Sequence, residues 1–425
     1  MGAVFFAILI VLYTIFGIFL YELRLWPFID EIFAMAIAGY GIFRMVIGKV
    51  PKNIPFIIWL CVAAFYLWYS LFIKSNEVMA IASDFIMQTK PYMVFFGLIC
   101  LKPKFERMHW VFLQISSMVF AFIICTIYAY YYNRIDLGLT VQGVLLSGEG
   151  LSATSILIGA LFYLSCDSDS LIVKVSTLLI MFTGMLVPTS KYIGILICAI
   201  AALFIINKPI KFNIKYIIIG ITAIAVIMWV VWDEFFFYFL DDYEYNARPM
   251  LYVTMPKILN DYFPFGSGLA TFASPASATW YSPLYIKYDL ELIWGLMEGE
   301  AWFVADVYYP TLAQFGYVGV GLFIWLLAYI FQQMNNMYYN MHDLKRYRVA
   351  LIIIAYLLIE ATSNSISNER CVLAMIILAL SLYKYTTPKR KFFELDSFGL
   401  KFIKFSHKNK SNSQIKSECD EDSNI

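Results

Sequence analysis

Apolar runs long enough to cross a lipid bilayer recur along this chain, and they constrain its fold more than any other feature. A helix that rises about 1.5 Å per residue crosses the roughly 30 Å hydrocarbon core with about 20 residues. The runs 3–20, 54–73, 110–130 and 214–231 are close to that length. Because lipid offers no hydrogen-bond partners, the backbone of such a run forms a helix, which satisfies its polar groups internally. The sequence therefore predicts an all-α fold.

The composition agrees with a protein that lies in a membrane. Hydrophobic residues make up 61% of the 425 residues and charged residues only 14%, whereas soluble domains carry about 25% charged residues. We expect a polytopic helical integral membrane protein with about 12 transmembrane helices. The candidate spans are 2–20, 28–47, 54–73, 78–101, 108–131, 150–165, 170–187, 190–207, 214–232, 310–332, 349–361 and 371–384.

Lysine and arginine gather in alternate connections between the runs. Cytoplasmic connections are enriched in these residues, so their positions predict the orientation of the chain. With the N-terminus inside, the basic connections at 44–52, 102–107, 208–211 and 345–348 all lie inside, as does the basic start of the C-terminal tail. Both termini are then cytoplasmic, and the long polar segment 233–309 lies outside.

The predicted organisation has four parts. Residues 1–232 hold nine transmembrane helices, 233–309 form one large outer loop, 310–384 hold three more helices, and 385–425 form a cytoplasmic polar tail. A long loop with its own charges, glycines and aromatic residues, carried by a helical scaffold, is where recognition or chemistry is expected.

Two segments depart from the pattern. The fourth run is interrupted by polar side chains, at Asp84, Gln88 and Lys90. Because such side chains are costly in lipid, we expect the true span to begin near Pro91. The inner turn 167–169 is acidic, where the charge rule expects basic residues.

The cysteines and histidines offer no metal site. None of the seven cysteines falls in 233–309, and the chain has no Cys-x-x-Cys pair or Cys/His cluster. His109, His342 and His407 all fall near the predicted cytoplasmic side, which excludes a histidine-dependent nucleophile outside. We expect no cofactor, no metal and no nucleic-acid partner.

Ser190 and Lys191 follow a threonine at the outer end of the eighth run. Free backbone N–H groups at a helix N-terminus favour an anion, and the lysine ammonium adds a point charge, so this position suits a phosphate. The alternative is a lysine that only anchors the helix at the membrane interface.

The outer loop contains a lone arginine and a glycine-rich turn. Arg248 lies among many carboxylates, so it is either an ion-pair partner or a bidentate clamp for a diphosphate. The turn at 264–272 reads Pro-Phe-Gly-Ser-Gly-Leu-Ala-Thr-Phe. Gly266 and Gly268 permit either a tight structural turn or a close approach to a ligand.

Three carboxylates, Glu298, Glu300 and Asp306, precede the tenth run. A carboxylate at a membrane surface is a candidate general base for a sugar hydroxyl, and it is also an ordinary solvated charge. Aromatic residues of the loop are suited to stacking on sugar faces, namely Trp280, Tyr281, Tyr285, Trp294 and Trp302.

The order of these motifs resembles the O-antigen polymerase/ligase superfamily over about 186–332. The matching residues are Ser190-Lys191, Arg248, the 264–272 turn, Asp306, Tyr309 and the Phe-Gly-Tyr-Val-Gly at 315–319. The family often has Ser-Arg where this chain has Ser190-Lys191, which keeps the charge and loses the guanidinium fork. The ligase branch is expected to carry a histidine near Asp306, and its absence here favours a polymerase.

The resemblance implies a multi-pass enzyme of the bacterial inner membrane with a periplasmic loop. It would move a growing glycan from undecaprenyl diphosphate to the non-reducing end of a new lipid-linked repeat unit, without a metal. Its partners would be the undecaprenyl-diphosphate-linked oligosaccharide, the lipid bilayer and a chain-length regulator. The implied catalytic residues are Arg248, Glu300 and Asp306, and the implied substrate-binding residues are Ser190, Lys191, Gly266, Gly268, Tyr309 and Arg370.

Two other classes remain open from the sequence. An O-antigen ligase uses the same fold family. A flippase or other transporter of lipid-linked oligosaccharides predicts charged side chains buried within spans, for which Asp30, Glu31 and Lys174 are candidates.

Overall fold

The computed structural model describes residues 8, 12–13, 28–50, 52–102, 105–132, 148–186, 189–209, 246–365 and 369–382. The chain divides into two units, Met1–Tyr385 and Thr386–Ile425, and every described residue belongs to the first. Regular structure in the described ranges is helical, with no strand among them. The predicted tail at 385–425, the run 214–232 and nearly all of the run 2–20 lie outside the described residues.

The long helices follow the predicted apolar runs closely, because the runs end where polar or glycine residues begin. They are α3 (Ile29–Val46), α4 (Ile54–Ile73), α5 (Val78–Leu101), α6 (Arg107–Tyr132), α8 (Gly148–Ser165), α9 (Leu171–Phe182), α10 (Ser190–Ile200), α16 (Gly316–Met341), α17 (Leu344–Glu360) and α18 (Glu369–Leu382). Short 3₁₀ or π segments extend some of them, at Thr183–Leu186, Ala201–Ile205 and Pro310–Phe315 (η8).

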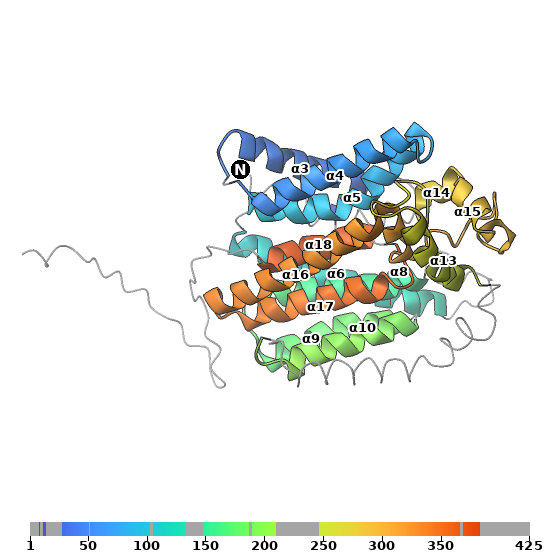
Figure 1. The fold of residues 1–425 in the computed structure, drawn as a ribbon. Helices are drawn as coiled ribbons and strands as arrows, with labels where there is room; N and C mark the ends of the chain where they lie inside the picture. Colours follow the sequence, from blue (N-terminus) through green and yellow to red (C-terminus); the bar gives the residue numbers. More distant parts are fainter. Residues whose placement is uncertain are drawn as a thin grey trace, which may run out of the picture. The chain divides into compact units, whose positions relative to one another are not determined.

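The helices pack side by side, as Figure 1 shows. α5 lies against α3, α4 and α18, while α17 contacts α8, α10 and α18. Polar loop helices α13 (Ala247–Asp261), α14 (Pro275–Thr279) and α15 (Pro283–Lys287) gather at one end of the bundle. α13 packs on η8, and α14 packs on α5, so the loop region is attached to the bundle on two sides.

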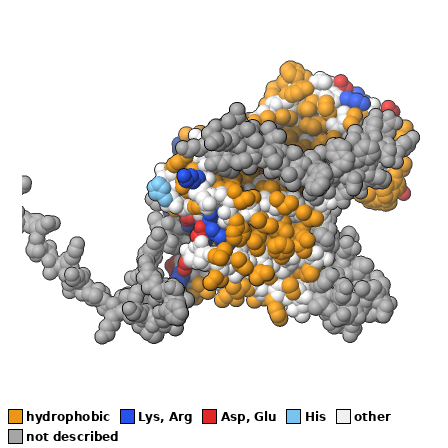
Figure 2. Space-filling model, turned by 90° about the horizontal axis from the view of Figure 1, so that it is seen from below, with side chains coloured by type: hydrophobic (Ala, Val, Ile, Leu, Met, Phe, Trp, Pro, Cys, Tyr) orange, Lys and Arg blue, Asp and Glu red, His pale blue; other side chains and the backbone are white. Residues whose placement is uncertain are grey.

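The surface of the bundle is apolar. Three helical segments, Ile54–Ile73, Arg107–Thr126 and Pro310–Met341, are long and apolar enough to cross a membrane. Large hydrophobic side chains on them are open to the surroundings, including Trp68, Phe72, Phe122 and Ile324. Figure 2 shows hydrophobic side chains over much of the visible face. Such a surface suits lipid and would be costly in water.

α5 is continuous through its polar residues. The helix runs from Val78 to Leu101, which matches the predicted run 78–101 and continues through Pro91 without a break. The carboxylate of Asp84 accepts the Ala270 N–H at 2.7 Å, and the ammonium of Lys90 pairs with two carboxylates of α3. Because both charges have partners inside the protein, neither interrupts the helix.

The acidic turn at 167–169 also has a partner. Asp169 accepts a hydrogen bond from Nη1 of Arg348 at 2.6 Å, and Lys174 lies 3.5 Å from the same carboxylate. Arg348 is 1% exposed and also donates to the Ile206 carbonyl and the Asn207 side chain. The turn therefore departs from the charge rule because an arginine near the start of α17 neutralises it.

We predict that Arg348→Met lowers the free energy of unfolding by about 2 to 3 kcal/mol, since the Ile206 carbonyl and Asp169 lose their donor. Arg346→Met is the matched control, because Arg346 pairs with Asp343 three residues away and should cost below about 1 kcal/mol. Thermal unfolding of the purified protein in detergent measures both. Equal effects of the two variants would contradict the buried network.

Candidate functional site

The glycine-rich turn at 264–272 is packed against the start of α16. Gly266 has φ +86°, and a Cβ at this position would come within 2.3 Å of the Gly316 nitrogen. Gly316 has φ +64°, and its own Cβ would meet the Gly266 nitrogen and the Pro264 carbonyl at 2.3 Å. The two glycines therefore let two backbones touch, and a side chain at either one would separate them.

Polar groups of α4 and α5 hold the same turn from the other side. The hydroxyl of Ser70 accepts the Leu269 N–H at 2.9 Å, and Asp84 accepts the N–H of Ala270. Further bonds to its carbonyls come from Tyr69, Ser75, Asn76 and Gln314. Ser75 packs against Gly268. A Cβ added to Gly268 would lie 2.7 Å from the Cβ of Ser75. In this structure Gly266 and Gly268 serve the packing of the turn.

Arg248 forms an ion pair with Asp306. The distance from Nη2 to Oδ2 is 2.9 Å, and each side chain is about one-third exposed, at 32% and 31%. Arg248 lies in the first turn of α13, and its buried Nε meets no acceptor among the described residues. The guanidinium therefore keeps donors available beyond the one that Asp306 uses.

Lys191 lies in the first turn of α10, as the sequence predicts. The helix begins at Ser190, and the Thr189 hydroxyl caps it by accepting the Tyr192 N–H at 3.4 Å. Nζ of Lys191 lies 3.5 Å from Oε1 of Glu360, a carboxylate whose side chain is 1% exposed. The Asn364 amide donates to the same oxygen at 2.8 Å.

The end of α17 carries Glu360 of one ion pair and is bonded to residues that neighbour the other pair in sequence. We call residues 358–364, which contain the last residues of α17, the exit segment. The Tyr309 hydroxyl donates to the Leu358 carbonyl at 2.8 Å, and the Tyr308 N–H donates to the Ala361 carbonyl at 3.1 Å. Tyr252, one helical turn after Arg248, donates to the Thr362 carbonyl at 2.8 Å. Loss of hydration raises the pKa of Tyr252, so its hydroxyl stays protonated as a donor.

The exit segment thus brings most of the predicted site residues to one end of the bundle. Lys191 contacts Glu360 directly, Tyr309 is bonded to Leu358, and Arg248 and Asp306 lie close along the chain to Tyr252 and Tyr308. Arg370 is buried at the start of α18, which packs on α17. Ser190 is half-buried at the first position of α10.

Glu300 lies apart from this group. Its side chain is exposed, and its backbone N–H bonds to the Met297 carbonyl in an isolated bridge. The nearby rings of Trp294 and Trp302 are 58% and 60% exposed and lie edge to face, with centroids 5.9 Å apart. No ion pair or hydrogen bond joins the Glu300 side chain to the other described site residues.

Sequence reasoning missed Glu360. The signal was present, because Glu360 is the single carboxylate in the run 349–361. A buried acid inside an apolar run requires a partner, and here the partner is Lys191.

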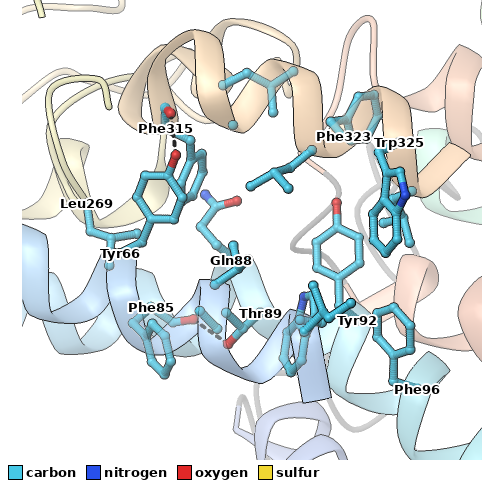
Figure 3. A pocket seen from close by; sticks show the side chains of 18 of the residues that line it. Tyr66, Phe85, Gln88, Thr89, Tyr92, Phe96, Leu269, Phe315, Phe323 and Trp325 are labelled. Carbon is cyan, nitrogen blue, oxygen red and sulfur yellow. Dashed lines mark hydrogen bonds between the residues drawn. The ribbon is translucent and has the colours of Figure 1, made fainter. Parts of the chain in front are cut away.

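A cavity of about 120 Å³ lies between α4, α5, α16 and η8. Aromatic side chains form about half of its wall, among them Trp59, Tyr92, Phe96, Phe323 and Trp325. Tyr308 also lines it, and the hydroxyls of Tyr92 and Tyr308 are bonded at 2.7 Å. Figure 3 shows Gln88 directed into the space, and its buried Oε1 has no partner among the described residues. Because Tyr308 follows Asp306 closely, the cavity adjoins the charged group.

Comparison with known proteins finds no relative of this chain. Neither a scan against protein-family models nor a search of the curated proteins finds a match. The likeness to the O-antigen polymerase/ligase superfamily therefore rests on the motif residues themselves.

We predict that Gly266→Ala destabilises the protein by more than about 2 kcal/mol, because the strain of positive φ adds to a backbone clash with Gly316. Gly299→Ala is the matched control. Gly299 has φ +81° and open space around its Cβ position, so only the backbone strain of about 1 kcal/mol remains. Thermal unfolding of both variants compares the two costs, and similar losses would argue against the Gly266–Gly316 contact.

Proposed function

We propose that the protein is a polymerase of lipid-linked oligosaccharide repeat units, for an O-antigen or a capsule. It transfers the growing glycan from undecaprenyl diphosphate to the non-reducing end of a new lipid-linked unit, without a metal. The observation that carries the proposal is the set of contacts at the exit segment: Lys191 pairs with Glu360 inside it, and Tyr252 of α13, one helical turn after Arg248, is bonded to its Thr362 carbonyl.

A diphosphate is a good leaving group when its charge is neutralised. Arg248 is about one-third exposed, and its guanidinium has more N–H donors than the single bond to Asp306 uses, so a phosphate oxygen can bind to it. Lys191 supplies a second positive charge at the N-terminus of α10, where free backbone N–H groups also favour an anion. Such fixed donors stabilise the negative charge that develops on the departing diphosphate.

Asp306 is the carboxylate best placed to serve as the base, since it already contacts Arg248, whereas Glu300 lies apart. A diphosphate that takes the guanidinium releases Asp306 to accept the proton of the acceptor hydroxyl. The acceptor oxygen then forms a bond to the anomeric carbon of the growing glycan. The bond from that carbon to the diphosphate breaks, and undecaprenyl diphosphate leaves with the electron pair.

The cavity beside the charged group suits the lipid part of the substrate. Its wall is aromatic and aliphatic, and Tyr308 reaches it from the segment that also carries Asp306. An isoprenoid chain is apolar and branched, so it gains contact with such rings. The exposed pair Trp294 and Trp302 offers aromatic faces on which sugar rings can stack.

The same proposal includes the membrane arrangement. The protein lies in the bacterial inner membrane with about 12 transmembrane helices, cytoplasmic termini and the 233–309 loop in the periplasm. In that compartment no nucleotide sugar is available, so a donor already activated on lipid fits the site.

A transporter of lipid-linked oligosaccharides is the second candidate, and one observation favours it. Asp30 and Glu31 are buried and paired with Lys90, as expected for charges inside a transporter. Lys174 does not support this candidate, because it pairs with Asp169 near the start of α9. A cell that lacks a flippase keeps unflipped lipid-linked units inside, whereas a cell that lacks a polymerase exports single units.

We predict that Arg248→Ala lowers the rate of polymerisation by about 10²- to 10³-fold, because a donor to the leaving diphosphate is lost. Arg248→Lys should recover part of the rate, since it keeps the charge and loses the fork. The distribution of polysaccharide lengths, measured by gel in a strain that lacks the protein, reports the result.

Lys257→Ala is the control for this experiment, because Lys257 is an exposed cation on the same helix α13. It should leave the chain lengths unchanged. Full-length polysaccharide from both Arg248 variants, at normal protein levels, would rule out the catalytic role of Arg248.

Filling the cavity tests the site for the lipid chain. Ala63 is buried on α4 and lines the cavity, so Ala63→Phe should raise the KM for a substrate with a full polyprenyl chain by roughly tenfold, through lost apolar contact. A substrate with a shortened chain should be affected less. Ala64→Phe is the control, since Ala64 is exposed on the neighbouring face of α4. Equal effects on long-chain and short-chain substrates would contradict the assignment.

A further inference from the structure

Two carboxylates and one ammonium form a buried cluster between α3 and α5. Nζ of Lys90 lies 2.8 Å from Oε1 of Glu31 and also contacts Oδ2 of Asp30. Asp30 is 0% exposed, Lys90 3% and Glu31 9%, so the cluster is closed to solvent. We call these three residues the α3–α5 triad.

The triad is buried between the two helices. Lys90 is near the middle of α5, a helix of 24 residues, about 18 Å from its first residue at a rise of about 1.5 Å per residue, whereas Asp30 and Glu31 lie in the first turn of α3. Charged groups at such a depth face the interior of a membrane protein and find partners there.

The charges of the triad do not balance. With both acids ionised, two negative charges face one positive charge. α3 packs on α5 and α18, and the described titratable side chains of these two helices are Asp84, Lys90, Tyr92, Cys100, Arg370 and Cys371. Of these, only Lys90 forms an ion pair or hydrogen bond with Asp30 or Glu31 among the described residues. The first turn of α3 favours negative charge at its N–H groups, but it supplies no full positive charge.

Two oxygen atoms of the triad are also unsatisfied. Oδ1 of Asp30 and Oε2 of Glu31 are buried, and neither has a hydrogen-bond partner among the described residues. An unpaired carboxylate oxygen in a low dielectric is costly, and protonation removes both the excess charge and the need for an outside cation.

A metal ion fits this position less well than a proton. Hard cations take about six or more oxygen ligands, and the triad offers only two unsatisfied oxygens. Within the described ranges no group of three or more acidic, histidine or cysteine side chains is placed to hold a metal. We propose that Asp30 and Glu31 together bind one proton beside Lys90, and that the triad is a proton-binding site inside the membrane.

This site is independent of the proposed glycan transfer, and it has a consequence for the neighbouring cavity. With the proton bound, the triad is neutral and joins α3 to α5. Without it, an uncompensated negative charge lies between the two helices and favours their separation. α5 also carries Gln88 and Tyr92 of the cavity wall, so proton occupancy is linked to the shape of that cavity.

Infrared spectroscopy of the full-length protein tests the proton directly. At neutral pH the wild type should show the C=O stretching band of a protonated carboxylic acid, shifted in D₂O. Asp30→Asn and Glu31→Gln should each remove this band, because the remaining carboxylate then balances Lys90. Asp84→Asn is the control, because Asp84 is a buried acid outside the triad and its substitution should leave the band in place. Persistence of the band in both triad variants, with its loss in Asp84→Asn, would overturn the proposal.

Thermal unfolding against pH gives a second test. The stabilisation that the bound proton gives to the folded state should be present at low pH and should be lost as rising pH removes the proton. Asp30→Asn and Glu31→Gln should lose this fall. Lys90→Met should lose stability more steeply as pH rises, since both acids then need protons in the folded state. Glu106→Gln, at an exposed acid, should follow the wild type.

The same unfolding measurement in sodium chloride and in potassium chloride distinguishes a bound proton from a bound metal cation. Equal curves in the two salts support the proton. Stabilisation at high pH by one of the two cations alone would overturn it, as would a flat pH profile in the wild type.

Discussion

A polar group inside this apolar bundle needs a partner from the protein, because neither lipid nor a hydrophobic core supplies one. Asp84 is bound by a backbone N–H of the loop, Arg348 by an acidic turn, and Lys191 by Glu360. Each of these contacts joins segments that are distant in sequence. The polar residues thus add specific pairings to a bundle whose helices also pack through a shared apolar core.

The loop segment 246–315 is held to the bundle by the same means. Its glycine-rich turn is bonded to α4 and α5 on one side and touches Gly316 on the other, and the residues around Tyr308 are bonded to the exit segment. Arg248 and Asp306 are consequently held on a fixed frame, although both lie in the loop region. A site for chemistry benefits from such a frame, since positioning supplies much of the rate for substrates that share a membrane.

The sequence predicted the helices well and their partners poorly. Hydropathy gave the bounds of α4, and those of α10 together with its π extension, within a few residues, and the threonine before Ser190 marked the helix start beside Lys191. The continuity of α5 was not predictable, because it depends on Ala270 and on α3, whose contacts with Asp84 and Lys90 lie 186 and about 60 residues away. Glycine composition likewise indicated a tight turn at 264–272, but only the packing of Gly266 on Gly316 distinguishes a structural role from ligand approach.

The anchoring of the 264–272 turn also determines the order in which the protein is assembled. Ser70 and Asp84 are synthesised almost 200 residues before their partners Leu269 and Ala270, and Gly316 is made later still. During synthesis the polar anchors on α4 and α5 therefore precede the backbone groups that fill them, and the turn can reach its observed packing only once Gly316 has been made. The turn is thus completed late, after the two helices that hold it.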